Sequence, residues 1–147
     1  MAGEKNRGGR PKILIADDNP QILELLEAYL EPLGVEVVLA ADGQAAVAAV
    51  ERERPDLILL DIMMPKRSGF EVCRSLKDDP RYRDIPIIMV TALNELGDVE
   101  RARKSGADDY LSKPVNKIQL LERVQSLLRV RYHKRPTPPS STGTEPA

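Results

Sequence analysis

The chain holds few of the residues on which many enzymes depend. Its only histidine, His133, falls in the C-terminal tail, so histidine-based acid–base catalysis and histidine-rich metal sites are not expected in the folded body. Its only cysteine, Cys73, cannot form an intramolecular disulfide, and its apolar neighbours in a helical pattern indicate a buried core residue. Aromatic residues make up 3% of the chain and tryptophan is absent, which leaves little surface for stacking on nucleic-acid bases.

Long apolar segments are also absent. No run approaches the roughly 18 residues that a membrane-spanning helix needs, and residues 1–12 lack the apolar stretch of a secretory signal. We therefore expect a cytoplasmic protein that has no membrane partner. The 147 residues, 41% of them apolar, suffice for one domain with its own core.

The charge of the chain is unevenly distributed. Residues 1–12 and 129–147 each hold four basic side chains and one acidic one. Of the 22 basic and 23 acidic side chains in the chain, this leaves 14 basic and 21 acidic ones in the middle. An acidic body with two short basic ends is a poor binder of nucleic acid, so we expect no direct contact with DNA or RNA.

Short apolar runs that suit strands alternate with segments of helical spacing. The predicted strands lie at 12–16, 35–40, 57–61, 86–92 and 107–112, and the predicted helices at 20–33, 42–54, 69–77, 97–105 and 116–128. Asn19 and Pro20 suit the start of the first helix, and Gly34 suits its end. Ser68 and Glu71 have the spacing of a capping box at the third helix.

Five strands that alternate with five helices predict a parallel sheet covered on both faces, which is a doubly wound, three-layer α/β domain. We place this domain at residues 12–131. Residues 1–11 are rich in glycine and charge, and residues 132–147 are rich in proline, serine and threonine. Both ends are therefore predicted to be disordered.

Reactive side chains lie at the ends of four of the predicted strands. Asp17 and Asp18 follow the first strand, and Asp61 ends the third. Thr91 lies near the end of the fourth strand, and Lys113 follows the fifth. Because the carboxyl ends of parallel strands share one edge of the sheet, these groups are expected to lie together.

Such a cluster points to a cation and to phosphate. Carboxylates in one pocket repel each other, and oxygen ligands that leave room for water suit Mg²⁺. A lysine beside the metal adds a second positive charge, which suits phosphoryl transfer, and a carboxylate can itself accept the phosphoryl group. Taken singly, each residue also has a structural explanation, since acids after strands are common helix caps, a threonine can simply end a strand, and a lysine can be a solvated surface charge.

Four motifs carry a family resemblance over roughly residues 12–131. They are ILIADDNP, LILLDIMMPKRSG, PIIMVTA and GADDYLSKP. In this order they make the chain resemble the receiver domain of the response regulators of bacterial two-component systems. The resemblance implies the flavodoxin-like receiver fold, with strand order 2-1-3-4-5.

The resemblance also implies a role for each carboxylate. Asp61 is similar to the aspartate that becomes phosphorylated. Asp17 and Asp18 are similar to the acid pair that binds Mg²⁺, with Mn²⁺ as the alternative ion. The backbone carbonyl of Met63 resembles the remaining protein ligand of that metal.

Further residues match the switching machinery of the family. Thr91 resembles the switch hydroxyl that turns toward the phosphate, and Lys113 resembles the lysine that contacts the phosphate. Tyr110 is similar to the aromatic switch residue, although it can also be interpreted as an ordinary, partly buried strand aromatic. Lys113–Pro114 matches the usual cis peptide of the family, and only X–Pro bonds adopt cis at low cost.

By resemblance, then, the chain is a switch in phosphorelay signal transduction rather than a turnover enzyme. A sensor histidine kinase or histidine phosphotransfer protein would supply the phosphoryl group. The surface of the fourth helix, fifth strand and fifth helix would change and signal to a downstream protein target. A phosphorylation-dependent homodimer through that surface is compatible with the resemblance.

Two alternatives remain at this point. The chain can be a stand-alone regulator, which we favour because of its low-complexity tail, or the receiver part of a longer regulator with an output domain. A more distant alternative is an aspartate-based, Mg²⁺-dependent phosphohydrolase. Those enzymes usually carry a D-x-D pattern after the first strand, whereas this chain reads ADDN there.

Overall fold

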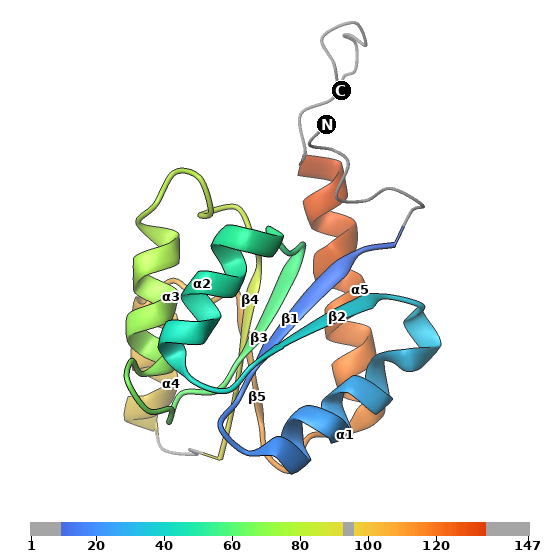
Figure 1. Ribbon diagram of the computed structural model, residues 1–147, viewed down its shortest axis with the longest axis horizontal. Coiled ribbons are helices and arrows are strands. Elements are labelled where there is room, and N and C mark those ends of the chain that lie inside the picture. Colours follow the sequence, from blue (N-terminus) through green and yellow to red (C-terminus); the bar gives the residue numbers. More distant parts are fainter. Residues whose placement is uncertain (1–9, 93–95, 135–147) are drawn as a thin grey trace, which may run out of the picture.

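The computed structural model describes residues 10–92 and 96–134, except for the side chains of residues 91, 96–99 and 131–134. Its strands form one parallel sheet in the order β2-β1-β3-β4-β5 (Figure 1). They are β1 (Lys12–Ala16), β2 (Glu36–Ala40), β3 (Leu57–Leu60), β4 (Ile87–Thr91) and β5 (Asp109–Ser112). The predicted fold class and strand order are confirmed.

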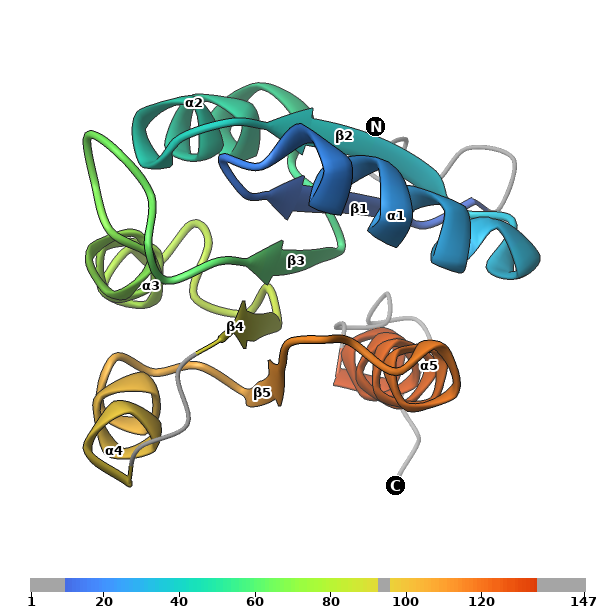
Figure 2. The same ribbon diagram turned by 90° about the horizontal axis from the view of Figure 1, so that it is seen from below.

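Helices cover both faces of the sheet and form the two outer layers. They are α1 (Pro20–Leu30), α2 (Gly43–Glu53), α3 (Gly69–Lys77), α4 (Leu96–Lys104) and α5 (Lys117–Lys134). Figure 2 shows α1 and α5 on one side of the sheet and α2, α3 and α4 on the other. Within the described ranges, no helix combines the length and the apolar character needed to cross a bilayer.

The alternating side chains of the central strands divide the core into two clusters. Leu14 of β1 and Ile58 of β3 belong to the cluster under α2, α3 and α4, whereas their neighbours Ile13 and Leu59 belong to the cluster under α1 and α5. All four residues of β3 are buried, as expected of a strand covered on both faces. Burial on both faces explains the uninterrupted apolar runs that end beside the acidic residues.

The first helix ends earlier than its apolar pattern predicts. The α-helix stops at Leu30, and a 3-10 turn (Glu31–Leu33) follows before Gly34, which adopts a left-handed φ of 66°. Pro32 explains the difference, because proline has no N–H to donate and its ring clashes with the carbonyl four residues earlier in an α-helix. The prediction of one helix over 20–33 is therefore wrong in its last turn.

The described structure continues past both predicted domain boundaries. Arg10 donates hydrogen bonds to the carbonyl oxygens of Gly34 and Val35, so the residues that enter β1 are attached to the loop before β2. At the other end, α5 continues to Lys134 and includes residues 132–134, which were assigned to the disordered tail. The expectation of disorder for residues 1–9 and 135–147 falls outside the described residues.

A partly buried lysine ties the far end of α3 to the loops beside β4 and β5. The Lys77 ammonium donates to the carbonyl oxygens of Arg83 and Ile85, and to the carboxylate of Asp108 at 2.9 Å. The same Asp108 oxygen accepts the backbone N–H of Ile87 at 2.8 Å, where β4 begins. The Lys77 side chain is only 16% exposed, and its bonds join three segments that the sequence separates.

We expect Lys77→Met to lower the free energy of unfolding by about 1–3 kcal/mol, because the Asp108 carboxylate and two carbonyl groups lose a charged donor while the apolar stem is kept. Lys104→Met, at an exposed position of α4, is the matched control and should change stability by no more than about 0.5 kcal/mol. Urea unfolding followed by circular dichroism measures both. Equal losses in the two variants would contradict the assigned role of Lys77.

Candidate functional site

The acidic site forms where two neighbouring strands end at the same level. β1 and β3 pair in parallel with Ala16 opposite Leu60, so the next residues, Asp17 and Asp61, emerge side by side. The backbone fixes both positions: the Asp61 N–H donates to the carbonyl of Ala16, and the Asp17 N–H donates to that of Ala40. The carboxylates are thus aimed by rigid sheet backbone.

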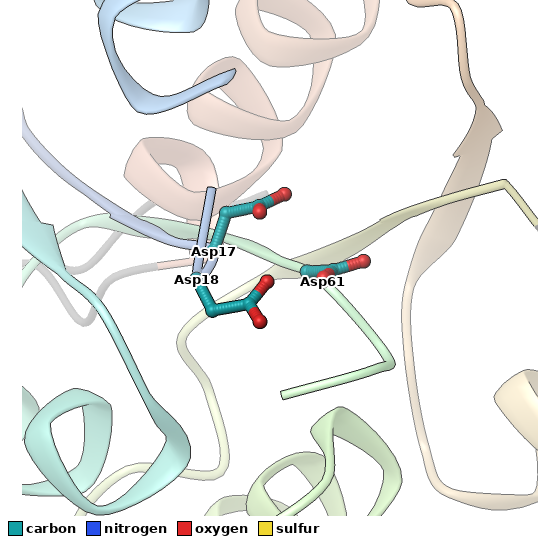
Figure 3. Close-up of side chains that lie close together, drawn as sticks. All are labelled: Asp17, Asp18 and Asp61. Atoms are coloured by element: carbon teal, nitrogen blue, oxygen red, sulfur yellow. The ribbon is translucent and has the colours of Figure 1, made fainter. Parts of the chain in front are cut away.

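Asp18 completes a group of three carboxylates. One oxygen each of Asp17, Asp18 and Asp61 lies within 4.8 Å of the others, and Figure 3 shows the three side chains gathered at the ends of their strands. Asp17 and Asp61 are 2% and 5% exposed, whereas Asp18 is exposed to solvent. The group therefore has a buried side, held by protein, and an open side that water or a ligand can reach.

Lys113 supplies the positive charge at this site. It follows directly after β5, and its ammonium lies 2.8 Å from Asp17 Oδ2 and 3.5 Å from Asp61 Oδ1. The side chain therefore extends past the end of β4 to the acids that follow β1 and β3. Its peptide bond to Pro114 is cis, as the family resemblance implies.

Asp17 is also held by the start of α1. Its Oδ1 accepts the backbone N–H of Asn19 at 2.9 Å, while its Oδ2 binds Lys113. The Asn19 side chain in turn caps α1 by accepting the N–H of Gln21. The residue predicted as a helix cap therefore also fixes the orientation of Asp17.

The surroundings raise the pKa of Asp61 to about 6. Burial is the main cause, because it disfavours the charged carboxylate, and the negative charge of Asp17 acts in the same direction. The charge of Lys113 opposes both effects. For Lys113 itself, burial lowers the pKa, but its bond to Asp17 and the charge of Asp61 outweigh this effect and leave the pKa raised.

A glycine packs against the backbone of Asp61 from the start of α3. A Cβ at Gly69 would overlap the carbonyl oxygen of Asp61 and lie 2.8 Å from the Cα of Ile62. The Gly69 N–H donates to the carbonyl of Ile62 at 2.8 Å. Ser68 and Glu71 form the predicted capping box before this contact, so the start of α3 limits where Asp61 can lie.

The donor set is compatible with a hard divalent cation. Three carboxylates face one ammonium, which leaves the cluster negative, and all of the acidic donors are oxygens. The exposed side of Asp18 leaves room for water ligands, which small divalent ions retain. The residues present therefore fit a metal that is bound partly by protein and partly by solvent.

The predicted site residues fall into two groups. Asp17, Asp18, Asp61 and Lys113 lie together, as the sequence analysis predicts. Thr91 is the last residue of β4, but its side chain lies outside the described residues. Two others are in place along the chain but face solvent: Tyr110 on β5 is 43% exposed, and Met63, two residues after Asp61, is 65% exposed.

Sequence reasoning missed the second role of Asn19 and the contacts of two glycines. Gly69 closes the LILLDIMMPKRSG motif but was assigned no contact, and Gly43 was not singled out. The contacts themselves are not visible in the sequence, because each joins backbone segments that meet only after folding. The available signals were the motif position of Gly69 and the Asp42–Gly43 pair at a predicted helix start.

Comparison with known proteins agrees with this geometry. The family model for the response regulator receiver domain matches residues 13–125. The response regulator PleD of Caulobacter vibrioides is 48% identical over 120 residues, which are 82% of this chain but 26% of PleD. The DNA-binding dual master transcriptional regulator RpaA of Synechocystis is 47% identical over 119 residues, 81% of this chain and 49% of RpaA. The chain thus spans half or less of these relatives.

Solved structures match over almost their whole length. A CheY-like response regulator receiver domain protein from Methanospirillum hungatei has a TM-score of 0.79 at 33% identity, covering 85% of this chain and 98% of that one. The receiver domain of the sensor histidine kinase PA1611 from Pseudomonas aeruginosa, solved with a magnesium ion in its active-site cleft, has a TM-score of 0.76 at 37% identity. It covers 82% of this chain and 98% of its own.

The raised pKa of Asp61 predicts that Asp61→Asn stabilises the protein above about pH 6 when no divalent cation is present. Between the ordinary carboxyl pKa of 3.8 and about 6, the folded state holds a proton that the unfolded state releases, so folding stability falls as pH rises through this window. The gain in the variant should reach the order of 2 kcal/mol, because one pKa unit corresponds to about 1.4 kcal/mol and the site is partly open to solvent.

Urea unfolding in EDTA between about pH 4.5 and 8 measures this difference. The advantage of Asp61→Asn should be largest at the upper end and shrink toward pH 4.5. Asp78→Asn, at an exposed acid on the surface after α3, is the control and should show no such trend. A pH-independent gain at position 61 would argue against the assigned pKa.

Proposed function

The chain belongs to the response regulator receiver domain family, and on that premise we propose that it accepts a phosphoryl group on Asp61 from a phosphohistidine partner. The observation that carries the proposal is the buried Asp61 carboxylate, aimed by β3 and flanked by Asp17 and Lys113. A carboxylate in this setting is poorly solvated and charge-compensated, which suits a nucleophile for phosphorus.

The transfer step uses the ionised form of Asp61. With a pKa of about 6, the carboxylate is mostly charged at neutral pH. One of its oxygens attacks the phosphorus, the new P–O bond forms as the P–N bond breaks, and the electron pair of the broken bond returns to the donor imidazole. Attack of water on the same phosphorus later releases inorganic phosphate and restores Asp61.

Mg²⁺ is the proposed metal, with Mn²⁺ as the alternative. Asp17, Asp18, Asp61 and the carbonyl of Met63 would hold it. When bound, it would neutralise the acidic cluster and the phosphoryl oxygens. The magnesium ion in the cleft of the PA1611 receiver domain supports this assignment, and so does the all-oxygen donor set described above.

Lys113 and Thr91 are proposed to bind the phosphoryl oxygens. The Lys113 ammonium pairs with Asp17 and lies near Asp61, so a phosphoryl group on Asp61 would compete with Asp17 for it. Because Lys113 directly follows β5, a movement of the lysine would also displace the end of β5 and the start of α5. This coupling supports a switch in the surface formed by α4, β5 and α5, in which Thr91 and Tyr110 take part.

One ion pair across that surface can rearrange. Asp109 of β5 pairs with Arg123 of α5 at 2.6 Å, and both side chains are partly exposed. This pair can therefore exchange partners without opening the core.

The proposed partners are a sensor histidine kinase or histidine phosphotransfer protein as donor and a downstream protein as target, in the cytoplasm. A homodimer through α4, β5 and α5 is a further proposed state of the phosphorylated form. The chain acts as a switch rather than a turnover enzyme, either alone or as the receiver of a longer regulator. The shares of PleD and RpaA that it matches, 26% and 49%, are compatible with the second arrangement.

The test of this function is phosphorylation by a small donor. Incubation with acetyl phosphate and Mg²⁺ should add one phosphoryl group, detected by intact mass spectrometry. The adduct should be absent in Asp61→Asn and in the presence of EDTA, while Asp78→Asn should be labelled like the wild type. A phosphoryl group that persists in Asp61→Asn would exclude Asp61 as the acceptor.

Steady turnover separates a switch from a phosphohydrolase. The protein should release phosphate from acetyl phosphate only slowly and through the Asp61 adduct. Rapid, Asp61-dependent turnover of a simple phosphate monoester would instead favour the phosphohydrolase alternative.

Proton release should accompany metal binding at this site. Because Asp61 must lose its proton to bind a cation, we expect the Mg²⁺ affinity to be constant above about pH 7 and to fall up to tenfold per pH unit below about 6. Isothermal titration calorimetry at several pH values measures the affinity, and two buffers of different ionisation enthalpy measure the released proton. An affinity that stays level down to pH 5 would contradict this linkage.

A further inference from the structure

The loop that leaves the acidic site contains a strained one-residue turn. Between β3 and α3, the Arg67 N–H donates to the carbonyl of Pro65 at 2.7 Å across Lys66. Lys66 has a φ of 72°, one of two positive values among the described non-glycine residues. A γ-turn with positive φ is the rarer, strained kind. Such a conformation persists only where surrounding contacts hold it.

The start of α2 supplies those contacts. The Gly43 N–H donates to the same Pro65 carbonyl at 3.3 Å, and Asp42, the N-cap of α2, faces the Lys66 ammonium at 3.9 Å. Gly43 is buried against the turn. A Cβ at this position would overlap the carbonyl oxygen of Arg67 and lie 2.7 Å from its Cβ. Only glycine lets the helix backbone approach the turn this closely.

Two glycine contacts therefore limit the loop at both ends. Gly69 packs on the Asp61 backbone where the loop begins, and Gly43 packs on the Arg67 backbone where it turns back. Met63 lies between them with its own side chain exposed, whereas Ile62 before it is buried in the core and Met64 after it packs against the core. The position of the Met63 backbone thus depends on these core contacts and also on the turn at Lys66 and the helix start behind that turn.

We infer that Gly43 is a positioning residue for the metal site, because its contact with the strained Lys66 turn sets where the Met63 carbonyl lies. The inference rests on the proposed function, in which that carbonyl binds Mg²⁺. It adds α2, which contributes no ligand, to the elements that determine metal affinity. A rigid ligand loop loses less entropy on binding an ion than a mobile one does.

Gly43→Ala separates this role from ordinary helix propensity. At a helix position without the contact, alanine in place of glycine stabilises the helix. Here the added Cβ must push away the Arg67 backbone and move the loop. We expect a five- to twentyfold loss of Mg²⁺ affinity by calorimetry, in protein shown to be folded by circular dichroism. Gln44→Ala, at the next and exposed position of α2, should retain the wild-type affinity within twofold.

Lys66→Gly provides a second test, in which no added side-chain atom clashes with the loop. Glycine adopts positive φ without strain, so the thermal midpoint should stay level or rise while the freed loop binds Mg²⁺ at least threefold more weakly. Lys66→Gln removes the charge but keeps the strained backbone, and it should bind Mg²⁺ within twofold of the wild type. A purely structural role for the turn would not weaken metal binding while stability is kept.

The outcomes distinguish this inference from the proposed function. If the wild type binds Mg²⁺ and forms the Asp61 adduct, but Gly43→Ala and Lys66→Gly bind Mg²⁺ normally, the inference is wrong and the function stands. If both variants lose affinity while the wild type forms no adduct, the inference stands and the function is wrong. A wild type that binds no Mg²⁺ overturns both.

Discussion

The main constraint on this structure is the repulsion between two buried carboxylates at the carboxyl ends of adjacent strands. Asp17 and Asp61 follow adjacent strands in register, so backbone hydrogen bonds place their charges side by side. The Lys113 ammonium offsets part of the repulsion between them, and the backbone N–H of Asn19, which donates to Asp17, offsets a further part. Burial, together with the negative charge of Asp17, still raises the pKa of Asp61 to about 6. This value keeps the carboxylate mostly charged at neutral pH, although its surroundings compensate that charge only in part.

Much of this arrangement was predictable because it depends on local patterns and parallel topology. Apolar runs fixed the strands, the caps at Asn19 and Ser68 fixed two helix starts, and parallel strands brought Asp17, Asp61 and Lys113 to one edge. The misses have physical causes. The apolar spacing of α1 continues through Pro32, which ends the helix although it does not interrupt the pattern. The bonds of Lys77 and the approach of Gly43 depend on segments that meet only in the folded chain.

The loop after Asp61 shows why a motif does not define a site by itself. The stretch from Asp61 to Gly69 is readily recognised in sequence, but its shape is held by residues outside it. The start of α3, which follows the loop, packs on it through Gly69, and the start of α2, which lies earlier in the chain, packs on it through Gly43. By the inference above, a change at Gly43 therefore acts on the acidic site without altering any of its three carboxylates.

The length of α5 determines how far a movement beside Lys113 can be transmitted. The helix spans 18 residues, from Lys117 to Lys134, which corresponds to about 27 Å at 1.5 Å per residue. Leu120, Val124 and Leu128 seat it on the sheet, and no residue after Leu128 is among the described core side chains. Of the residues after Leu128, Arg129 and Val130 are exposed. A tilt of about 5° about the Lys117 end would displace the Lys134 backbone by roughly 2 Å on this geometry, so a small change of angle beside the lysine becomes a larger displacement at the far end of the helix.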